Sequence, residues 1–131
     1  DSMGEYVASQ VVKLMIKKGI TINQAKLLMM GITFKENCPD VRNTKIVDVV
    51  HALEDYGIAV TIFDPWAKPE EVKHEYGLTT VNALPDSAFD AIVLGVAHKE
   101  FADIDFTLLK TANSVIFDVK GVLKATADAR L

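Results

Sequence analysis

The stretch that decides the fold is LLMMGITFKENCPDVRNTK, residues 27–45. It opens with an apolar run that is typical of a buried strand, and the run ends at Gly31. A polar loop follows, with Lys35, Arg42, two acidic residues and Cys38, and a helical pattern then begins at Lys45. A strand, a loop and a helix in this order begin a βαβ unit. The charged loop is therefore expected at the carboxyl end of a buried strand.

The rest of the chain continues this alternation. Apolar residues at helical spacing predict helices over residues 3–18, 45–56, 68–76 and 101–110. Short apolar or β-branched runs predict strands over residues 26–30, 59–63, 79–81, 91–96 and 114–119. The strands are nearly all apolar, as expected when helices cover both faces of a mostly parallel sheet. The pattern predicts one α/β domain with an extra helix in front.

Composition narrows the class of protein. The 131 residues suit one domain, and a chain that is 50% hydrophobic and 24% charged is expected to be soluble and globular. The net charge of -4 argues against a nucleic-acid partner. No apolar run approaches the roughly 18 residues that a membrane helix needs, and no signal peptide is visible. The single cysteine excludes an internal disulfide and fits a reducing cytoplasm. The start at Asp1 leaves open that the chain is a fragment.

Polar residues collect where a ligand is expected. In open α/β sheets, ligands bind beyond the carboxyl ends of the strands. Three such ends carry polar or charged groups, and these are residues 33–42, 64–66 and 97–99. Lys35 and Arg42 could grip a diphosphate, with help from the amino end of the following helix. Alternatively, they could pair with Glu36 and Asp40 and keep the loop soluble, and the spacing leaves both readings open.

Other candidate groups are weaker. There is no G-x-G-x-x-G and no G-x-x-x-x-G-K-[ST], so the usual glycine cradles for a nucleotide are absent from the sequence. Cys38 has no nearby histidine to act as a base, which favours a small loop residue over a nucleophile. The three histidines and one cysteine show no metal-ligand spacing. His98 could bind a ligand, cap the next helix or face water.

Several further residues receive structural readings. Asp64 and Asp118 each end a strand, and we expect them to cap the next turn rather than to act in acid–base catalysis. His51 and His74 fall within helical patterns and are expected at the surface. The helix over residues 3–18 has apolar residues on more than one side, so it could pack on the sheet or contact another domain or a second subunit.

The segment GITFKENCPDVRNT, residues 31–44, resembles the G-x-[TS]-[FY]-K-x-x-x-x-D-x-R-x-[ST] motif of the UDP-glucose/GDP-mannose dehydrogenases. Other matches follow in the order of that family. SMGEYV at residues 2–7 resembles N-D-x-M-G-x-Y-V, Asp64-Pro65 resembles Y-D-P, GVAHKEF at residues 95–101 resembles A-x-x-x-x-F, and Asp118-Val119-Lys120 resembles D-x-[KR]. The amino-acid sequence of the first segment is most similar to that of members that oxidise UDP-N-acetylhexosamines, including the Vi-antigen type.

The resemblance implies a fold and a domain organisation. It implies a three-layer, Rossmann-like domain with a mostly parallel five-stranded sheet in the order 3-2-1-4-5. Residues 1–19 would be the end of the connecting and dimerisation helix, and residues 20–131 the UDP-sugar-binding C-terminal domain. Full-length members also have an NAD-binding N-terminal domain and form homodimers or larger oligomers. Their catalytic cysteine lies in a G-G-x-C motif, which this sequence lacks, so Cys38 is not that nucleophile.

The resemblance also implies residue roles. Phe34 and Lys35 match residues that contact the UDP-sugar, and Arg42 matches an arginine that reaches NAD across the domain cleft. Lys120 stands where many members have an arginine near the phosphates. The implied function is substrate binding in a cytoplasmic NAD-dependent UDP-sugar 6-dehydrogenase for surface polysaccharide synthesis. The chain alone is expected to be inactive, with no catalytic residue and no metal ligand. The alternative is a stand-alone α/β nucleotide-binding or interaction module without catalysis.

Overall fold

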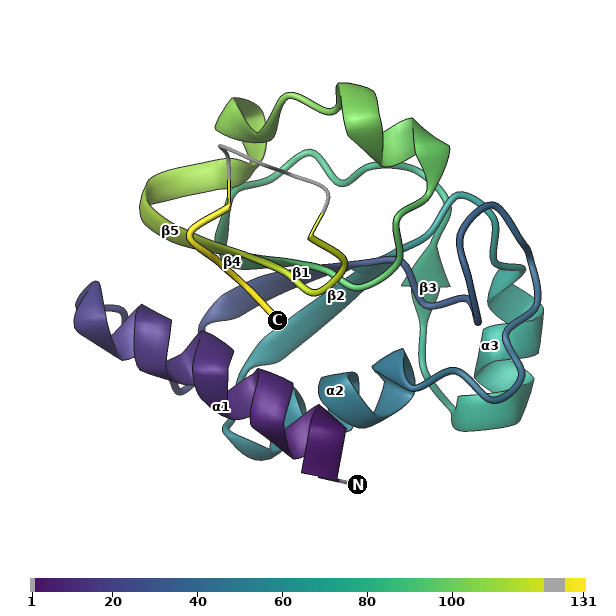
Figure 1. Ribbon diagram of the computed structural model, residues 1–131, viewed down its shortest axis with the longest axis horizontal. Coiled ribbons are helices and arrows are strands. Elements are labelled where there is room, and N and C mark those ends of the chain that lie inside the picture. The colour runs from purple at the N-terminus through teal and green to yellow at the C-terminus, as the bar shows by residue number, and fades with distance from the viewer. Residues whose placement is uncertain (1, 122–126) are drawn as a thin grey trace.

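A six-stranded parallel sheet forms the centre of the computed structural model, which describes residues 2–121 and 127–131 (Figure 1). The strands lie in the order β3-β2-β1-β4-β5-β6. Their bounds are β1 Lys26–Met30, β2 Ala59–Phe63, β3 Thr80–Val81, β4 Phe89–Leu94, β5 Lys110–Asp118 and β6 Ala129–Arg130. The order expected for the first five strands is confirmed. The short β6, which pairs with β5 at Phe117 and Asp118, was not predicted from the sequence.

Alternate residues of the central strands enter two separate cores. Leu27 and Met29 of β1 belong to one core, whereas Leu28 and Met30 belong to the other, and all four side chains are fully buried. Successive side chains of a strand point to opposite faces of its sheet. A continuous apolar run is therefore needed wherever both faces are covered, and this is why LLMM forms the central strand.

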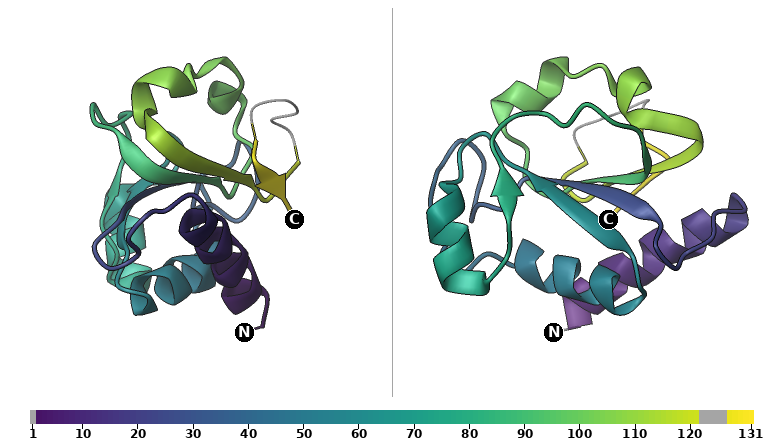
Figure 2. Two further views of the ribbon diagram at one scale, coloured as in Figure 1. Left: turned by 90° about the vertical axis from the view of Figure 1, so that its left-hand side faces the viewer. Right: turned by 180° about the vertical axis from the view of Figure 1, so that it is seen from behind.

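Two α-helices cover one face of the sheet and form the helix-side core. They are α1 Ser2–Lys17 and α2 Ile46–Asp55, and Figure 2 shows both on the same side of the strands. α1 packs mainly on α2 and buries Val7, Val11 and Met15 completely. Core packing is thus confirmed for this helix, although Tyr6 and Ile16 on its outer side are exposed. A third helix, α3 Pro69–Tyr76, connects β2 to β3 at the edge of the sheet.

Short 3-10 segments cover the opposite face, where the sequence predicted a helix over residues 101–110. They are η1 Lys99–Asp103 and η2 Phe106–Leu109. The Asp105 side chain accepts a hydrogen bond from the Thr107 N–H at 3.0 Å, which starts a new turn and interrupts helical continuation. Phe101, Phe106 and Leu109 are nevertheless buried in this turn-side core. The prediction of one continuous helix over residues 101–110 was therefore wrong, although helical segments do cover this face of the sheet.

The β5 strand also begins earlier than the predicted start at residue 114. Lys110 pairs with Phe89, and the register then shifts before Ala91 pairs with Val115. The residues that the prediction missed, 110–113, are all exposed and include no large apolar side chain, so their sequence carries no strand periodicity. None of the helices within residues 2–121 and 127–131 has the length and apolar character needed to cross a membrane.

Gly4→Ala tests the packing of α1 on α2. A Cβ atom at Gly4 would lie 2.8 Å from both the carbonyl carbon and the Cβ of Asp48. Alanine favours a helix over glycine by about 1 kcal/mol, so an unpacked α1 would gain stability from this change. We expect the opposite, a loss of about 1–3 kcal/mol from overpacking, measured by urea unfolding. Lys13→Ala on the exposed side of α1 is the control, and a stabilising Gly4→Ala would contradict the observed packing.

Candidate ligand-binding site

A small pocket opens at the carboxyl ends of β1, β4 and β5. Its volume is about 190 Å³, and its walls come from the loop after β1, the start of α2, the turn after β4 and the segment after β5. The charged residues in its lining are Lys35, Lys45 and Lys120, and among the described residues no carboxylate lines it. We call this the lysine pocket. All three residues expected to bind substrate, namely Phe34, Lys35 and Lys120, are therefore brought together here.

Two glycines allow the strand ends to approach each other beneath the pocket. Gly31 has a φ of +93°, and a Cβ atom there would lie 2.6 Å from the Val96 Cβ. A Cβ at Gly95 would lie 2.9 Å from the Ile46 Cδ1 and 3.3 Å from the Gly31 carbonyl oxygen. Any larger residue would push apart the loops after β1 and β4 and the start of α2. The lysine pocket thus depends on glycine at both positions.

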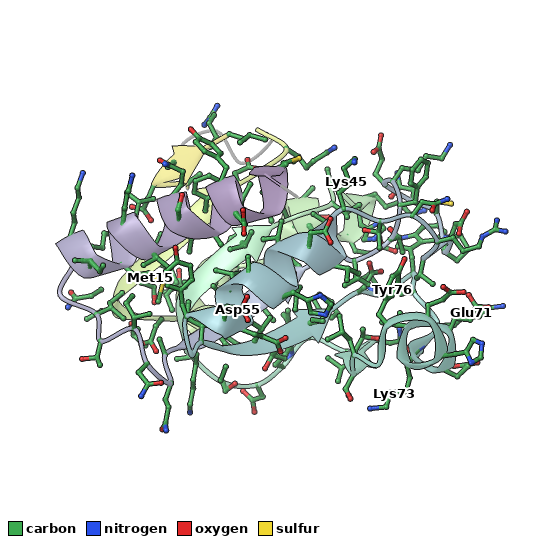
Figure 3. The ribbon with its side chains drawn as sticks, turned by 90° about the horizontal axis from the view of Figure 1, so that it is seen from below. Met15, Lys45, Asp55, Glu71, Lys73 and Tyr76 are labelled. Carbon is green, nitrogen blue, oxygen red and sulfur yellow. The ribbon has the colours of Figure 1, made fainter. Side chains whose placement is uncertain are left out.

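The electrostatic character of the lysine pocket is cationic. Lys35, Lys45 and Lys120 are exposed, and none of them forms an ion pair with any residue in the part of the chain that the structure describes. Figure 3 shows Lys45 at the amino end of α2, which carries partial positive charge from the helix dipole. The Phe34 side chain is 57% exposed beside them, although a phenyl ring is usually buried. These groups can take an anionic ligand that also has an apolar or aromatic face.

The loop that carries Lys35 is held in shape by its own backbone. The Phe34 N–H donates to the Asp40 carbonyl oxygen at 2.7 Å. Asn37 and Asn43 adopt left-handed backbone conformations, with φ values of +55° and +57°, which asparagine tolerates better than most residues. The Tyr76 hydroxyl of α3 donates to the Val41 carbonyl oxygen at 2.6 Å and joins the loop to that helix. The loop is therefore an ordered wall of the pocket.

A fully buried carboxylate lies below this loop. Asp64 follows β2, and its Oδ2 accepts hydrogen bonds from the Ile32 N–H at 2.7 Å and the Thr33 N–H at 3.2 Å. Its Oδ1 accepts from the Trp66 N–H at 2.7 Å and the Ala67 N–H at 3.0 Å. The turn-capping role expected of Asp64 is confirmed. Its bonds to the loop after β1 were not expected.

His98 completes this buried network from the end of β4. Its Nε2 lies 3.0 Å from the Asp64 Oδ2 and 3.1 Å from the Thr33 Oγ1, and its Nδ1 accepts from the Asn37 N–H at 2.9 Å. Of the sequence-based readings of His98, the surface residue was wrong, since His98 is only 2% exposed. His98 does stand at the N-cap position of η1, where its carbonyl oxygen accepts from the Phe101 N–H at 3.0 Å, but its side chain makes no capping hydrogen bond. A ligand contact by His98 stays a prediction. Burial alone would raise the pKa of Asp64, but hydrogen bonds from His98 and from the Ile32 and Trp66 N–H groups hold that pKa below its ordinary value.

Arg42 lies apart from the lysine pocket. It lines a separate open groove of about 680 Å³ between the loop and α3, together with Cys38 and His74. Its guanidinium binds Asp40 in two places, with Nε 3.1 Å from Oδ1 and a terminal nitrogen 3.2 Å from Oδ2. The reading in which Arg42 pairs with Asp40 is confirmed, and this contact raises the pKa of Arg42 and lowers the pKa of Asp40. Figure 3 marks the same side of the molecule by Glu71, another residue of the groove.

Three more side chains lie as the sequence predicted, namely Asp118, His51 and His74. Asp118 caps its turn as expected, because its Oδ1 accepts from the Lys120 and Gly121 N–H groups. His51 and His74 are exposed, as expected. Within residues 2–121 and 127–131, no three histidine, cysteine, aspartate or glutamate side chains lie close enough together to hold a metal ion.

Sequence reasoning missed two features of the site. One is Lys45, whose position just before a helix that follows the loop could have marked it as a third cation. The other is the pairing of Asp64 with His98. In the sheet order β2-β1-β4, these residues follow strands that flank the same central strand, so both can reach over its end at Gly31. The strand order, taken together with a histidine and an aspartate at equivalent strand ends, could have indicated this pair.

The fold and the site define an open parallel α/β domain with a cationic pocket at the carboxyl edge of its sheet. The chain belongs to the UDP-glucose/GDP-mannose dehydrogenase family, because residues 28–125 match the family's UDP binding domain. Curated relatives agree with this assignment. The chain is 47% identical to a UDP-N-acetyl-D-glucosamine 6-dehydrogenase from Pseudomonas aeruginosa and 46% identical to one from Salmonella typhi. All of the chain aligns in each case, but it spans only 32% of the length of either relative.

Solved structures share the fold. A UDP-D-ManNAc dehydrogenase from Pyrococcus horikoshii superposes with a TM-score of 0.77 at 20% identity, over 98% of this chain and 30% of that one. An NDP-N-acetyl-D-galactosaminuronic acid dehydrogenase from Methanosarcina mazei superposes with a TM-score of 0.78 at 22% identity, over 88% and 25% of the two chains. The architecture described above is therefore that of one part of these larger proteins.

Asp64→Asn tests the buried network. The amide would turn an NH₂ group toward backbone N–H donors and leave buried groups unsatisfied. We expect a loss of about 3 kcal/mol or more in the free energy of unfolding, measured with urea at neutral pH. Asp86→Asn, at an exposed position, is the matched control and should change stability by less than about 0.5 kcal/mol. A loss no larger than that of the control would show that the carboxylate is dispensable.

The same variant has a signature in its pH dependence. The folded-state pKa of Asp64 lies below the ordinary value of 3.8, so the folded protein holds this carboxylate charged where the unfolded chain takes up a proton. The resulting stabilisation is fully present well above pH 3.8 and is lost as the pH falls through that value toward the folded-state pKa. The stability gap between wild type and Asp64→Asn should therefore narrow below about pH 4.

Proposed function

We propose that this chain is the UDP-sugar-binding C-terminal domain of an NAD-dependent nucleotide-sugar 6-dehydrogenase. The observation that carries the proposal is the lysine pocket, with three cations and no carboxylate in its described lining, at the edge of the sheet where α/β folds bind ligands. Membership of the dehydrogenase family supports the enzyme over a stand-alone interaction module. The 47% identity to a UDP-N-acetyl-D-glucosamine 6-dehydrogenase supports a UDP-N-acetylhexosamine as the substrate, oxidised to its uronic acid for surface polysaccharide synthesis.

The lysine pocket suits the diphosphate of such a substrate. Lys35, Lys45 and Lys120 can each donate to phosphate oxygens, and the amino end of α2 adds a favourable dipole. The pocket volume of about 190 Å³ leaves the base and the sugar to extend outside it. Phe34 offers an exposed ring at its rim, against which an apolar face of the ligand can pack. These residues bind and orient the substrate, and none of them performs the oxidation.

NAD, which accepts hydride when bound, would be held mainly by an N-terminal domain that this sequence does not include. We assign one residue of this chain to the cofactor, Arg42. Its side chain is 75% exposed, so it can reach a ligand carried by another domain. Leaving Asp40 costs little, because water and salt screen an ion pair between exposed side chains. We further propose that residues 1–19 are the end of the connecting helix, that residues 20–131 form the substrate domain, and that the full-length protein is a cytoplasmic homodimer or larger oligomer.

Alanine substitution of Lys35 or Lys120 tests the substrate site. Removing one cation from a phosphate site removes a charge-assisted hydrogen bond, which is worth about 1.5–3 kcal/mol. We expect each variant to bind UDP about 10- to 100-fold more weakly than wild type, measured by calorimetry on this chain. Lys26→Ala and Lys110→Ala are matched controls, since both lysines are exposed at the opposite, amino end of the sheet. Equal affinity for UDP in all four variants would show that the lysine pocket does not bind UDP.

Arg42→Ala, compared with Lys35→Ala, tests which ligand each side chain contacts in the full-length dehydrogenase that we propose. The lysine pocket and the groove of Arg42 are distinct, so the two substitutions should have different kinetic effects. We expect Arg42→Ala to raise KM for NAD about tenfold with little change in KM for the UDP-sugar, and Lys35→Ala to do the reverse. If Arg42→Ala changed only the KM for the UDP-sugar, the assignment of Arg42 to the cofactor would be wrong.

A further inference from the structure

We propose that His98 is a positioning residue that holds Lys35 at the lysine pocket. It does so by hydrogen bonds to the loop before and after Lys35, and we call these two sets of hydrogen bonds the fastenings. This inference rests on the proposed function, because it assigns to His98 a part in binding the anionic substrate. His98 is not among the residues that line the lysine pocket. It acts through two residues of the loop, Thr33 before Lys35 and Asn37 after it.

The first fastening runs through Thr33. The Thr33 hydroxyl donates to the Lys35 carbonyl oxygen at 2.9 Å, so its oxygen is free to accept from the His98 Nε2–H at 3.1 Å. The same Nε2–H also faces the Asp64 Oδ2 at 3.0 Å. A chain of hydrogen bonds thus connects the buried carboxylate to the backbone of Lys35. Both Thr33 and His98 are almost fully buried, so water does not compete for these bonds.

The second fastening runs through Asn37. The Asn37 N–H donates to the His98 Nδ1 at 2.9 Å, and its side-chain Oδ1 accepts from the Lys99 N–H at 2.8 Å. Asn37 has a φ of +55°, so the chain turns sharply at the point where it is tied. Only three residues, 34–36, lie between the two fastenings. This short span restricts where the Lys35 side chain can begin.

These contacts also determine the protonation state of the imidazole. A backbone N–H can only donate, so Nδ1 must be an acceptor, and Nε2 then carries the proton of the neutral ring. The ring is held in place by Trp66, stacked at 6.1 Å between ring centroids, and by Phe101, edge-on at 5.3 Å. Nδ1 thus accepts the hydrogen bond from Asn37, and Nε2 donates to Thr33 and Asp64. These two roles can be removed separately by substitution.

Two near-isosteric variants separate the accepting role of Nδ1 from the donating role of Nε2. In His98→Gln the side-chain amide can reach the place of Nε2 and donate to Asp64 and Thr33, but nothing accepts from the Asn37 N–H. In His98→Asn the side-chain oxygen can take the place of Nδ1, which keeps the Asn37 bond. Phe106→Leu, a change within the turn-side core, controls for general loss of stability, because Phe106 belongs to that core and the hydrogen bonds of the fastenings involve other residues.

The experiment uses this chain and UDP as the probe. We expect His98→Gln to speed hydrogen exchange of the Asn37 amide at least tenfold and to weaken UDP binding about tenfold, measured by NMR. His98→Asn should keep the Asn37 amide as protected as in wild type and bind UDP more tightly than His98→Gln does. Phe106→Leu should lower the melting temperature without changing UDP affinity. In the wild type, ¹⁵N shifts of His98 should show the proton on Nε2.

Each contrary result overturns a specific part of the inference. Unchanged Asn37 exchange in His98→Gln would show that His98 does not hold the loop. Faster exchange with unchanged UDP affinity would show that the fastening does not position Lys35. If Phe106→Leu weakened UDP binding as much as His98→Gln does, the effect of His98→Gln would be explained by lost stability alone. If the wild-type chain bound no UDP, the proposed function would fail for this chain, and the exchange data would still decide whether His98 fastens the loop.

Discussion

The buried carboxylate of Asp64 is the interaction on which the ligand-binding edge of this domain depends. It is fully shielded from water, and it gathers N–H donors from the loop after β1, from its own turn after β2 and from the His98 imidazole after β4. A buried charge is tolerated only when it is fully hydrogen-bonded. The three loops therefore have to come together around it, and the sheet edge acquires a single defined shape.

The loop at residues 33–44 then divides this edge into two faces with different chemistry. On one side, Lys35 stands in a pocket whose described lining has no acid, and on the other side Arg42 lies against Asp40 in an open groove. One loop therefore carries two cations that line two different hollows. Hydrogen bonds from His98 hold the buried side of the loop, and the other sides face solvent. Charged side chains can therefore stand at the end of a buried strand without being buried themselves.

The accuracy of the sequence predictions varied with the range of the interactions involved. The strands and the helices around LLMM were predicted because burial on both faces and apolar spacing are local patterns. The turn-side segment was predicted wrongly as one helix, since Phe106 and Leu109 have the i, i+3 spacing of a helix and the break at Asp105 depends on one side-chain hydrogen bond. His98 was misread because its partners lie 34 to 65 positions away in the sequence.

By itself, the sequence determined the α/β class, the order of the strands, the family and the loop that carries Lys35 and Arg42. Periodicity and motif spacing are recorded along the chain, so they need no coordinates. Only the tertiary structure decided that Lys35, Lys45 and Lys120 share a pocket, that Arg42 lies outside it, and that a buried histidine fastens the loop. Those facts depend on how closely the loops beyond the strand ends approach one another, which Gly31 and Gly95 allow, and on where each side chain lies in the packed structure.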